Sequence, residues 1–246
     1  MSIYNQILSK IKSQKKLFAL LIDPDKHTDE SIKNLITDSN DAQVDYIFIG
    51  GSLLTNCIDH TTELIKNHTK IPVILFPGSL LQITSKADGM LLLSLISGRN
   101  PDLLIGNHVI ASAHIKRSGL EVLSTGYILI EGGKSTSVEY MSNTRPIPSE
   151  KTDIAIATAI AGERLGLKLI YLEAGSGAKN TLTFDMVKGV KENISIPLIV
   201  GGGLKTSDDI KNSLSAGADI VVVGTAIEND SKILKKLVET THAFNI

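Results

Sequence analysis

Eight short apolar segments, spread along the whole chain, are the feature that most constrains the fold. Each is three to six residues long, is rich in Val, Ile and Leu, and lacks the polar alternation of a half-exposed strand. They are Leu17–Ile22, Val44–Ile49, Val73–Phe76, Gly89–Leu93, Gly126–Ile130, Leu169–Leu172, Leu198–Val200 and Ile220–Val223. Such runs are typical of parallel strands that are covered on both faces.

Helical patterns with one polar face, such as "DESIKNLITDSN" and "TSDDIKNSLSAG", lie between most of these segments. Strand and helix alternating eight times predict an α/β fold, the (β/α)8 TIM barrel. No linker or shift in composition divides the chain, so we expect residues 1–246 to form a single domain. A doubly wound open sheet is the alternative. It is disfavoured because "IDPDKHTDE", after the first strand, is not a dinucleotide-binding fingerprint.

The connection between the third and fourth strands is short. It reads "PGSLLQITSKAD", whereas a parallel crossover with its helix needs at least about 10–12 residues and usually more. We therefore predict that the third helix of the barrel is missing or rudimentary, which would leave a lateral slot suited to a long apolar ligand. A short but intact helix is the alternative.

A long segment follows the fifth strand, from Glu131 to Lys151, and reads "EGGKSTSVEYMSNTRPIPSEK". Loops of more than about a dozen residues in compact domains commonly act as lids or binding loops. We expect that role here.

Composition excludes several classes of protein. The net charge is −1, aromatic residues make up 4% of the chain and tryptophan is absent, which argues against a nucleic-acid-binding protein. Cys57 is the one cysteine, so no internal disulfide can form, and we interpret it as a packing or surface thiol. The N-terminus lacks the apolar core of a signal peptide, and no window approaches the ~20 apolar residues of a membrane span. A cytoplasmic protein is expected.

Glycines follow the seventh and eighth strands, in "VGGGL" and "VGTAIE". Active sites of TIM barrels lie at the carboxyl ends of the strands, and the last two loops often bind phosphate against a helix N-terminus. Gly202, Gly203, Gly224 and Thr225 are therefore candidates for a phosphate site. Simple turn glycines are the alternative.

The sixth strand runs into a carboxylate and then into a glycine loop, in "LIYLEAGSGA". The amides of Gly175, Ser176 and Gly177 could complete the phosphate site. Tyr171 and Glu173 lie two apart on one strand and face the same side. A carboxylate can accept hydrogen bonds from hydroxyls and act as a general base, so this stretch predicts a bound phosphorylated polyol. Alternatively, Glu173 caps its own loop or pairs with a cation.

Carboxylates also follow the first strand. Asp23 ends it, Asp25 comes next, and Ser52 stands at the end of the second strand. Oxygen ligands of this kind suit Mg²⁺, which is commonly shared with substrate phosphates. A plain Asp-Pro-Asp turn is the alternative.

Basic residues and histidines are less informative. Arg99, Lys134 and Arg145 lie on the fourth and fifth loops, where they could meet a pyrophosphate or remain solvated surface charges. The histidines show no metal-ligand spacing, and we interpret them as structural or surface residues. They are His27, His60, His68, His108, His114 and His242.

Taken together, the motifs resemble those of the geranylgeranylglyceryl phosphate synthases. The resemblance covers about residues 17–230 and rests on "LIDPDK", "FIGGS", "ILFPGS", "NHV", "GYILIEGGKSTSVEYMS", "AGERLGLKLIYLEAGSGA", "VGGGL" and "VGTAIE". The most specific pieces are "YLEAGSGA" and "EGGKSTSVEY". The likeness is to the second group of the family, with archaeal and some bacterial members, which is related to heptaprenylglyceryl phosphate synthases.

The resemblance implies a barrel without its third helix, an apolar channel for a polyprenyl diphosphate, and Mg²⁺ held with Asp23 and Ser52. It also implies a set of residues that bind sn-glycerol 1-phosphate. These are Tyr171, Leu172, Glu173, Ala174, Gly175, Ser176, Gly177, Gly202, Gly203, Gly224 and Thr225. This chain departs from some bacterial relatives at Leu21, where they carry a lysine.

The implied reaction joins the 3-hydroxyl of the glycerol phosphate to a polyprenyl chain, which we expect to be geranylgeranyl, and releases pyrophosphate, giving an ether lipid precursor. Glu173 and Asp23 would be its catalytic residues. We also expect a homo-oligomer, a dimer or an assembly of dimers, with peripheral membrane contact through the lipid.

Two other functions compete. A phosphosugar isomerase or aldolase would usually need a lysine, or a pair of acids, that points into the barrel from a strand. No strand core carries a lysine. A non-catalytic phosphate-ligand binding protein would leave Asp23 and Ser52 without a purpose.

Overall fold

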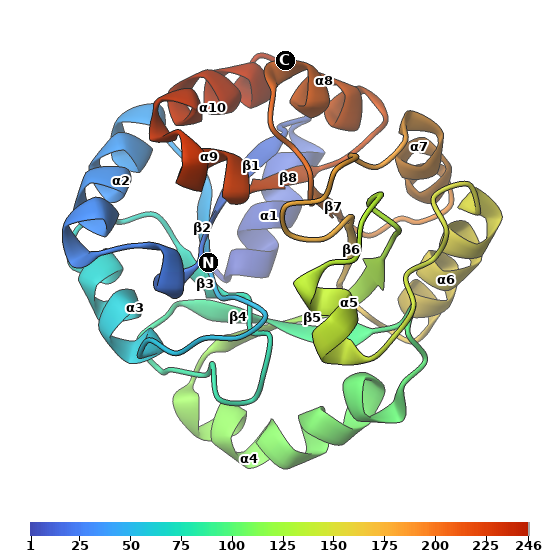
Figure 1. Cartoon of the computed structure of the whole chain (residues 1–246), viewed down its shortest axis with the longest axis horizontal. Helices are drawn as coiled ribbons and strands as arrows, with labels where there is room; N and C mark the ends of the chain where they lie inside the picture. Colours follow the sequence, from blue (N-terminus) through green and yellow to red (C-terminus); the bar gives the residue numbers. More distant parts are fainter. Residues whose placement is uncertain (246) are drawn as a thin grey trace.

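Eight parallel strands close into a barrel in which each strand pairs with its neighbours in chain order, and β8 returns to β1 (Figure 1). The structure is a computed structural model that describes residues 1–245. The strands are β1 Leu17–Ile22, β2 Tyr46–Ile49, β3 Val73–Leu75, β4 Gly89–Leu95, β5 Glu121–Leu129, β6 Leu169–Glu173, β7 Leu198–Gly201 and β8 Ile220–Val223. The predicted TIM barrel is thereby confirmed and the open sheet is wrong.

Helices ring the barrel on the outside (Figure 1). They are α2 Asp29–Ala42, α3 Ile58–Lys66, α4 Asn107–Ser118, α6 Thr152–Arg164, α7 Phe184–Glu192, α8 Ser207–Ser215 and α10 Leu234–His242. The shorter α5 (Ser137–Ser142) and α9 (Thr225–Asn229) lie on the loops after β5 and β8. Single turns occur at Pro24–Lys26 (η1), Asp102–Gly106 (η2) and Ser231–Ile233 (η3). Capping boxes fix where two helices begin, with Thr28 before α2 and Thr206 before α8.

No helix forms between β3 and β4, a stretch that the structure describes throughout. Because α3 lies between β2 and β3, the missing element is the third helix of the barrel, as predicted. The side chain of Gln82 uses its amide to join two loops, donating to the carbonyl of Gly51 (2.8 Å) and accepting from the N–H of Gly78 (3.0 Å). Leu80 and Ile83 pack against the core, so irregular chain covers this wall.

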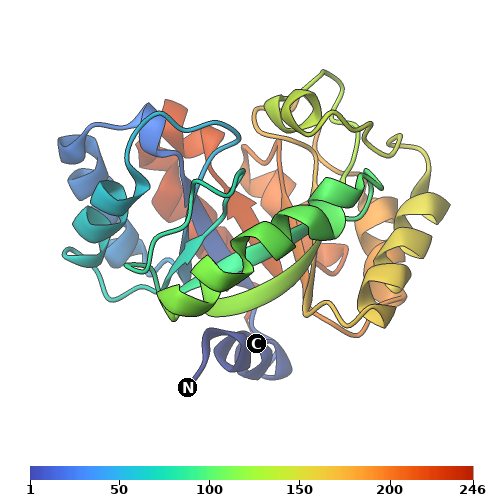
Figure 2. The same cartoon turned by 90° about the horizontal axis from the view of Figure 1, so that it is seen from below.

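The N-terminal helix α1 (Ile3–Lys12) closes the amino end of the barrel, and Figure 2 shows it below the strands. The carboxylate of Glu121 accepts hydrogen bonds from the N–H groups of Ile3 (2.5 Å) and Tyr4 (2.8 Å), which have no partner within the helix. A ligand therefore has access from the carboxyl end of the strands.

Side chains of each strand alternate between the barrel interior and the helices. On β6, Leu169 and Tyr171 belong to the interior cluster, whereas Ile170 and Leu172 pack in the outer cluster. Glu173 continues the inward series, so its carboxylate lies at the top of the interior. Among residues 1–245 no helix has both the length and the hydropathy to cross a bilayer.

Candidate active site

The loops that follow β6, β7 and β8 meet at the mouth of the barrel. The hydroxyls of Ser176 and Thr225 lie 3.2 Å apart. A Cβ on Gly202 would lie only 2.3 Å from Oε1 of Glu173 and 2.6 Å from the N of Gly175. The structure thus brings together candidate residues that are up to about 50 positions apart in the sequence.

Four glycines of these loops need their lack of a side chain. The φ angles are +96° at Gly175, +65° at Gly177, +80° at Gly202 and +72° at Gly203, in the left-handed region that L residues with a Cβ rarely adopt. Gly224 differs from these four, because its φ is −126° and needs no glycine. It lies close to β1 instead: a Cβ on Gly224 would lie 3.2 Å from the carbonyl oxygen of Leu21.

Six backbone N–H groups of these loops donate no hydrogen bond within the part of the chain that the structure describes. They belong to Ser176, Gly177, Gly202, Gly203, Gly224 and Thr225. By contrast, Ala174 donates to the carbonyl of Gly201 (3.1 Å) and Gly175 donates to Glu173. We call these six residues the anion cup, because free N–H groups at a loop and helix start favour a bound anion.

Glu173 is an unusual carboxylate because it is 5% exposed and has no cationic partner among the described residues. Burial raises its pKa to about 7, opposed by the N–H of Gly175 (2.7 Å) and by the nearby Tyr171 hydroxyl. A carboxylate that titrates near neutral pH is suited to general base chemistry. The hydrogen bond from Gly175 shows that Glu173 caps its own loop, while its binding of a polyol stays a prediction.

Tyr171 presents a second polar atom at the same place. Its hydroxyl is buried, yet no described residue meets hydrogen-bond geometry with it. The carboxylate of Glu173 lies close enough to this hydroxyl to interact with it, so the two groups form one buried polar pair at the top of the barrel.

An aromatic layer underlies these groups, and of its three rings the sequence analysis selected Tyr171 but not Phe76 or Tyr127. The ring of Tyr171 stacks on Phe76 with centroids 5.2 Å apart and lies 5.4 Å from Tyr127. Tyr127 and Tyr171 are cross-strand partners in the β5–β6 register. Inward alternation on the two strands was the signal that could have found Tyr127.

The two aspartates after β1 have different environments. Asp25 accepts hydrogen bonds from the N–H and hydroxyl of Thr55 (2.8 and 2.9 Å) and from the N–H of Asn56 (2.8 Å), so it holds the loop after β2 in place. Asp23 is half-buried, and burial raises its pKa. A Cβ on Gly51 would lie 3.1 Å from Oδ2 of Asp23, which places the Ser52 loop directly beside this carboxylate.

Neighbouring acids do not complete a metal site. Among residues 1–245 no group of three His, Cys, Asp or Glu side chains could hold a metal ion. The sequence analysis did not select Glu228 on α9. Burial raises the pKa of Glu228, and the nearby negative charge of Asp23 raises it further. Any cation at Asp23 would therefore depend on further oxygens, from the Ser52 hydroxyl, from water or from a substrate.

The three basic candidates are exposed and make no ion pair in the described chain. Of these, Lys134 is beside the anion cup, with its Nζ 3.6 Å from where a Cβ on Gly177 would stand. Arg99 has a φ of +53° and Arg145 follows α5, with no contact to the cup recorded for either.

Most histidines serve the fold, as expected. His60 pairs with Asp29 and His242 with Asp45, both at 2.9 Å, and His108 bonds to the carbonyl of Leu93 (2.8 Å). Cys57 is an exposed thiol before α3.

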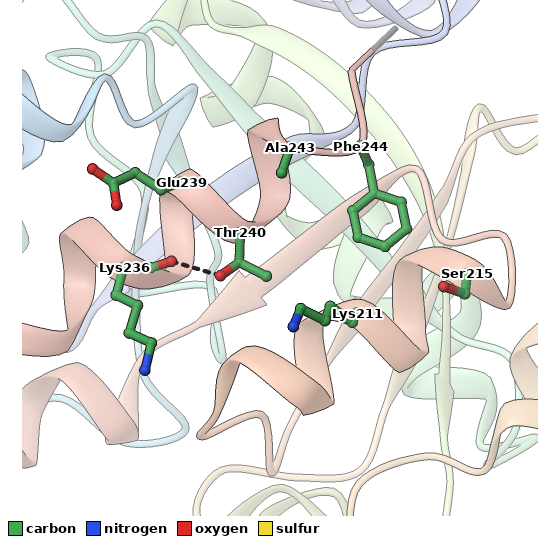
Figure 3. Close-up of a pocket in the computed structure, with 7 residues that line it drawn as sticks. All are labelled: Lys211, Ser215, Lys236, Glu239, Thr240, Ala243 and Phe244. Atoms are coloured by element: carbon green, nitrogen blue, oxygen red, sulfur yellow. Dashed lines mark hydrogen bonds between the residues drawn. The ribbon is translucent and has the colours of Figure 1, made fainter.

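Two surface hollows lie outside the anion cup. Figure 3 shows the first, between α8 and α10 on the outside of the barrel. It is lined by Lys211, Ser215, Lys236, Glu239, Thr240, Ala243 and Phe244. The second lies between α2 and α3. Neither includes Glu173 or the anion cup, so the free polar groups, not the hollows, mark the candidate site.

Comparison with known proteins shows the family to which the chain is similar. Residues 9–241 match the sequence profile of the PcrB family. The geranylgeranylglyceryl phosphate synthase of Chitinophaga pinensis is 49% identical over 98% of this chain and 96% of its own length. That of Flavobacterium johnsoniae is also 49% identical, over 94% and 95%.

A solved structure extends the likeness to the backbone. The crystal structure of (S)-3-O-geranylgeranylglyceryl phosphate synthase from Thermoplasma acidophilum in complex with sn-glycerol-1-phosphate superposes with a TM-score of 0.93. It is 30% identical to this chain, and 99% of each chain is covered.

Proposed function

The chain belongs to the PcrB family, and from this we propose that it is a prenyltransferase that joins sn-glycerol 1-phosphate to geranylgeranyl diphosphate. The observation that carries the proposal is the placement of a buried carboxylate, Glu173, beside six unpartnered N–H groups. One end of this arrangement suits a phosphate and the other suits a diol. Its expected product is an ether lipid precursor.

The acceptor would bind along Tyr171 to Gly177. The anion cup would hold its phosphate, and the hydroxyl of Tyr171 and the carboxylate of Glu173 would hold its two hydroxyls. Leu172 packs outward, so only its backbone could take part, and Ala174 and Gly175 would shape the loop.

The transfer would form a bond between the 3-oxygen of the acceptor and C1 of the prenyl chain. The C1–oxygen bond to the diphosphate breaks, and pyrophosphate leaves with the bonding electrons. The proton of the 3-hydroxyl passes to Glu173, whose pKa of about 7 matches that task. Holding the two substrates in line contributes through orientation.

Mg²⁺ fits the residues at the end of β1. The half-buried carboxylate of Asp23 and the hydroxyl of Ser52 on the adjacent loop would hold it. Few protein ligands are needed, because Mg²⁺ usually keeps waters and binds substrate phosphates. When bound, the ion would neutralise charge on the departing pyrophosphate.

The prenyl tail would run along the wall that lacks a helix. Leu80 and Ile83 from the irregular connection between β3 and β4 pack there, and Leu81 beside them is 91% exposed. We assign the chain to the second group of the family on its sequence motifs.

Two contacts with other molecules complete the proposal. The outer face of α4 and the turn before it exposes Ile105, Val109 and Ile110 (60%, 65% and 73%), and a homo-oligomer would bury this face. Leu53 and Leu81 are exposed on two loop segments without charged residues, 50–57 and 77–85, which Gln82 holds together, and they suit peripheral contact with a membrane.

Incubation with labelled geranylgeranyl diphosphate and sn-glycerol 1-phosphate, with and without Mg²⁺, tests the function. We expect one ether product and one pyrophosphate per turnover, both dependent on Mg²⁺, and strong loss of both in Glu173→Gln. Wild-type protein that binds glycerol phosphate but forms no ether would be a binding protein and would refute the proposal.

A further inference from the structure

The loop after β5 is fixed against the loop after β6. The N–H groups of Lys179 and Asn180 both donate to the carbonyl of Gly132, each at 3.0 Å. Gly133, with a φ of +80°, has the side chain of Asn180 where a Cβ would be. Thr136 is buried and fills the space beside Gly175. Residues 132–136 therefore have a defined place beside the anion cup.

Lys134 lies in the middle of this fixed stretch. Its Nζ comes within 3.6 Å of the position that a Cβ on Gly177 would take, so the ammonium lies beside the cup at Gly177. Within residues 1–245 it makes neither a hydrogen bond to a side chain or carbonyl nor an ion pair. Lys205, which also approaches this loop, is already engaged with the carbonyl of Ala178 (3.1 Å).

The anion cup itself contains no cation. It offers only N–H groups and two hydroxyls, from Ser176 and Thr225. A phosphate monoester carries up to two negative charges near neutral pH, and a nearby ammonium would offset part of that charge.

We propose that Lys134 is a substrate-binding residue that contacts the phosphate of the acceptor. The inference rests on the proposed function for the identity of that acceptor. The position of Lys134 selects the acceptor phosphate over the diphosphate of the donor. Lys134 follows β5, whereas Asp23 and Ser52 follow β1 and β2 across the eight-stranded barrel.

The contact lies at the solvent edge, so the expected effect is moderate. Lys134→Met should raise the KM and the Kd for sn-glycerol 1-phosphate about three- to tenfold at low salt, with kcat and the KM for geranylgeranyl diphosphate unchanged. The difference from wild type should shrink in 0.5 M salt, because salt screens exposed charges. Lys134→Arg should keep most of the affinity.

Calorimetric titration of the full-length protein with sn-glycerol 1-phosphate alone measures the Kd without turnover. Lys179→Met is the matched control: it removes the same charge from an exposed side chain of the neighbouring loop and should leave the Kd unchanged. Thermal melting should show Lys134→Met and wild type unfolding at the same temperature.

An unchanged Kd in Lys134→Met, or an equal rise in Lys179→Met, would overturn the assignment. So would a rise confined to the KM for the diphosphate. If wild type binds glycerol phosphate but transfers no prenyl group, the proposed function fails while the Kd comparison still decides the role of Lys134.

Discussion

Replacing Glu173 by Gln should stabilise the fold above neutral pH while it removes activity. The folded protein holds this carboxyl inside the barrel, where burial raises its pKa from 4.5 to about 7. Between these two pH values the unfolded chain has lost the proton and the folded chain still binds it. The free energy of unfolding therefore falls as pH rises through this window.

The size of the effect follows from the shift. At about 1.4 kcal/mol per pKa unit, a rise from 4.5 to about 7 costs the folded wild type about 3 kcal/mol once the pH exceeds 7. Gln has no charge to bury, and its amide oxygen can still accept the hydrogen bond from Gly175. The variant should thus escape that cost.

Urea unfolding of both proteins without ligand, from pH 4.5 to pH 8, measures this difference. The stability of Glu173→Gln relative to wild type should increase with pH by about 3 kcal/mol and then level off. Glu150→Gln, at an exposed position, should show no such trend. A difference that stays constant across the range would refute the burial argument and with it the assignment of Glu173 as a base near pH 7.

Three further outcomes are expected. Asp23→Asn should cut turnover strongly at saturating Mg²⁺ while calorimetry finds near-normal glycerol phosphate binding; wild-type turnover would remove Asp23 from the site. Gly202→Ala should cost about 2–4 kcal/mol in urea unfolding, because its Cβ would collide with Glu173 at 2.3 Å in addition to the strain of a positive φ. The control Gly166→Ala, also at positive φ but with no atom within 4 Å, should cost about 1 kcal/mol, and equal costs would contradict the collision. Catalytic efficiency should rise from ten- to twenty-carbon donors, since each buried methylene is worth roughly 0.8 kcal/mol, and equal reactivity below saturation would exclude a bound tail.

Most of the barrel could be predicted, because strands that are buried on both faces have continuous apolar sequences. The errors lie where a strand contains polar residues. β5 begins at Glu121, five residues before the predicted start. Ser124 and Thr125 interrupt its apolar pattern, yet the Thr125 hydroxyl finds the carbonyl of Leu123 (2.9 Å) and Ser124 accepts from the N–H of Lys168 (3.2 Å). The bond between Ser124 and Lys168, which are 44 residues apart, is a tertiary contact that composition cannot reveal.

The candidate site divides along the same line. Glycines and carboxylates at strand ends could be selected from the sequence, because the fold brings strand ends together. The local sequence cannot tell whether Asp25 binds a ligand or stabilises a neighbouring loop. Its hydrogen bond from Thr55 joins residues 30 positions apart, which no local pattern encodes. The segment after β5, predicted as a loop, also contains the short helix α5.

The seam between β3 and β4 has a consequence for how such enzymes diverge. These strands share only two register pairs, Ile74 with Gly89 and Leu75 with Met90, whereas β4 and β5 share seven. The connection between β3 and β4 therefore contributes little to the strand pairing that sets the geometry of the barrel. Selection can lengthen, shorten or refill this one stretch while β6, β7 and β8, across the barrel, keep the anion cup intact. If the donor tail binds along this connection and the acceptor binds at the cup, as proposed, the two specificities can evolve separately within one closed sheet.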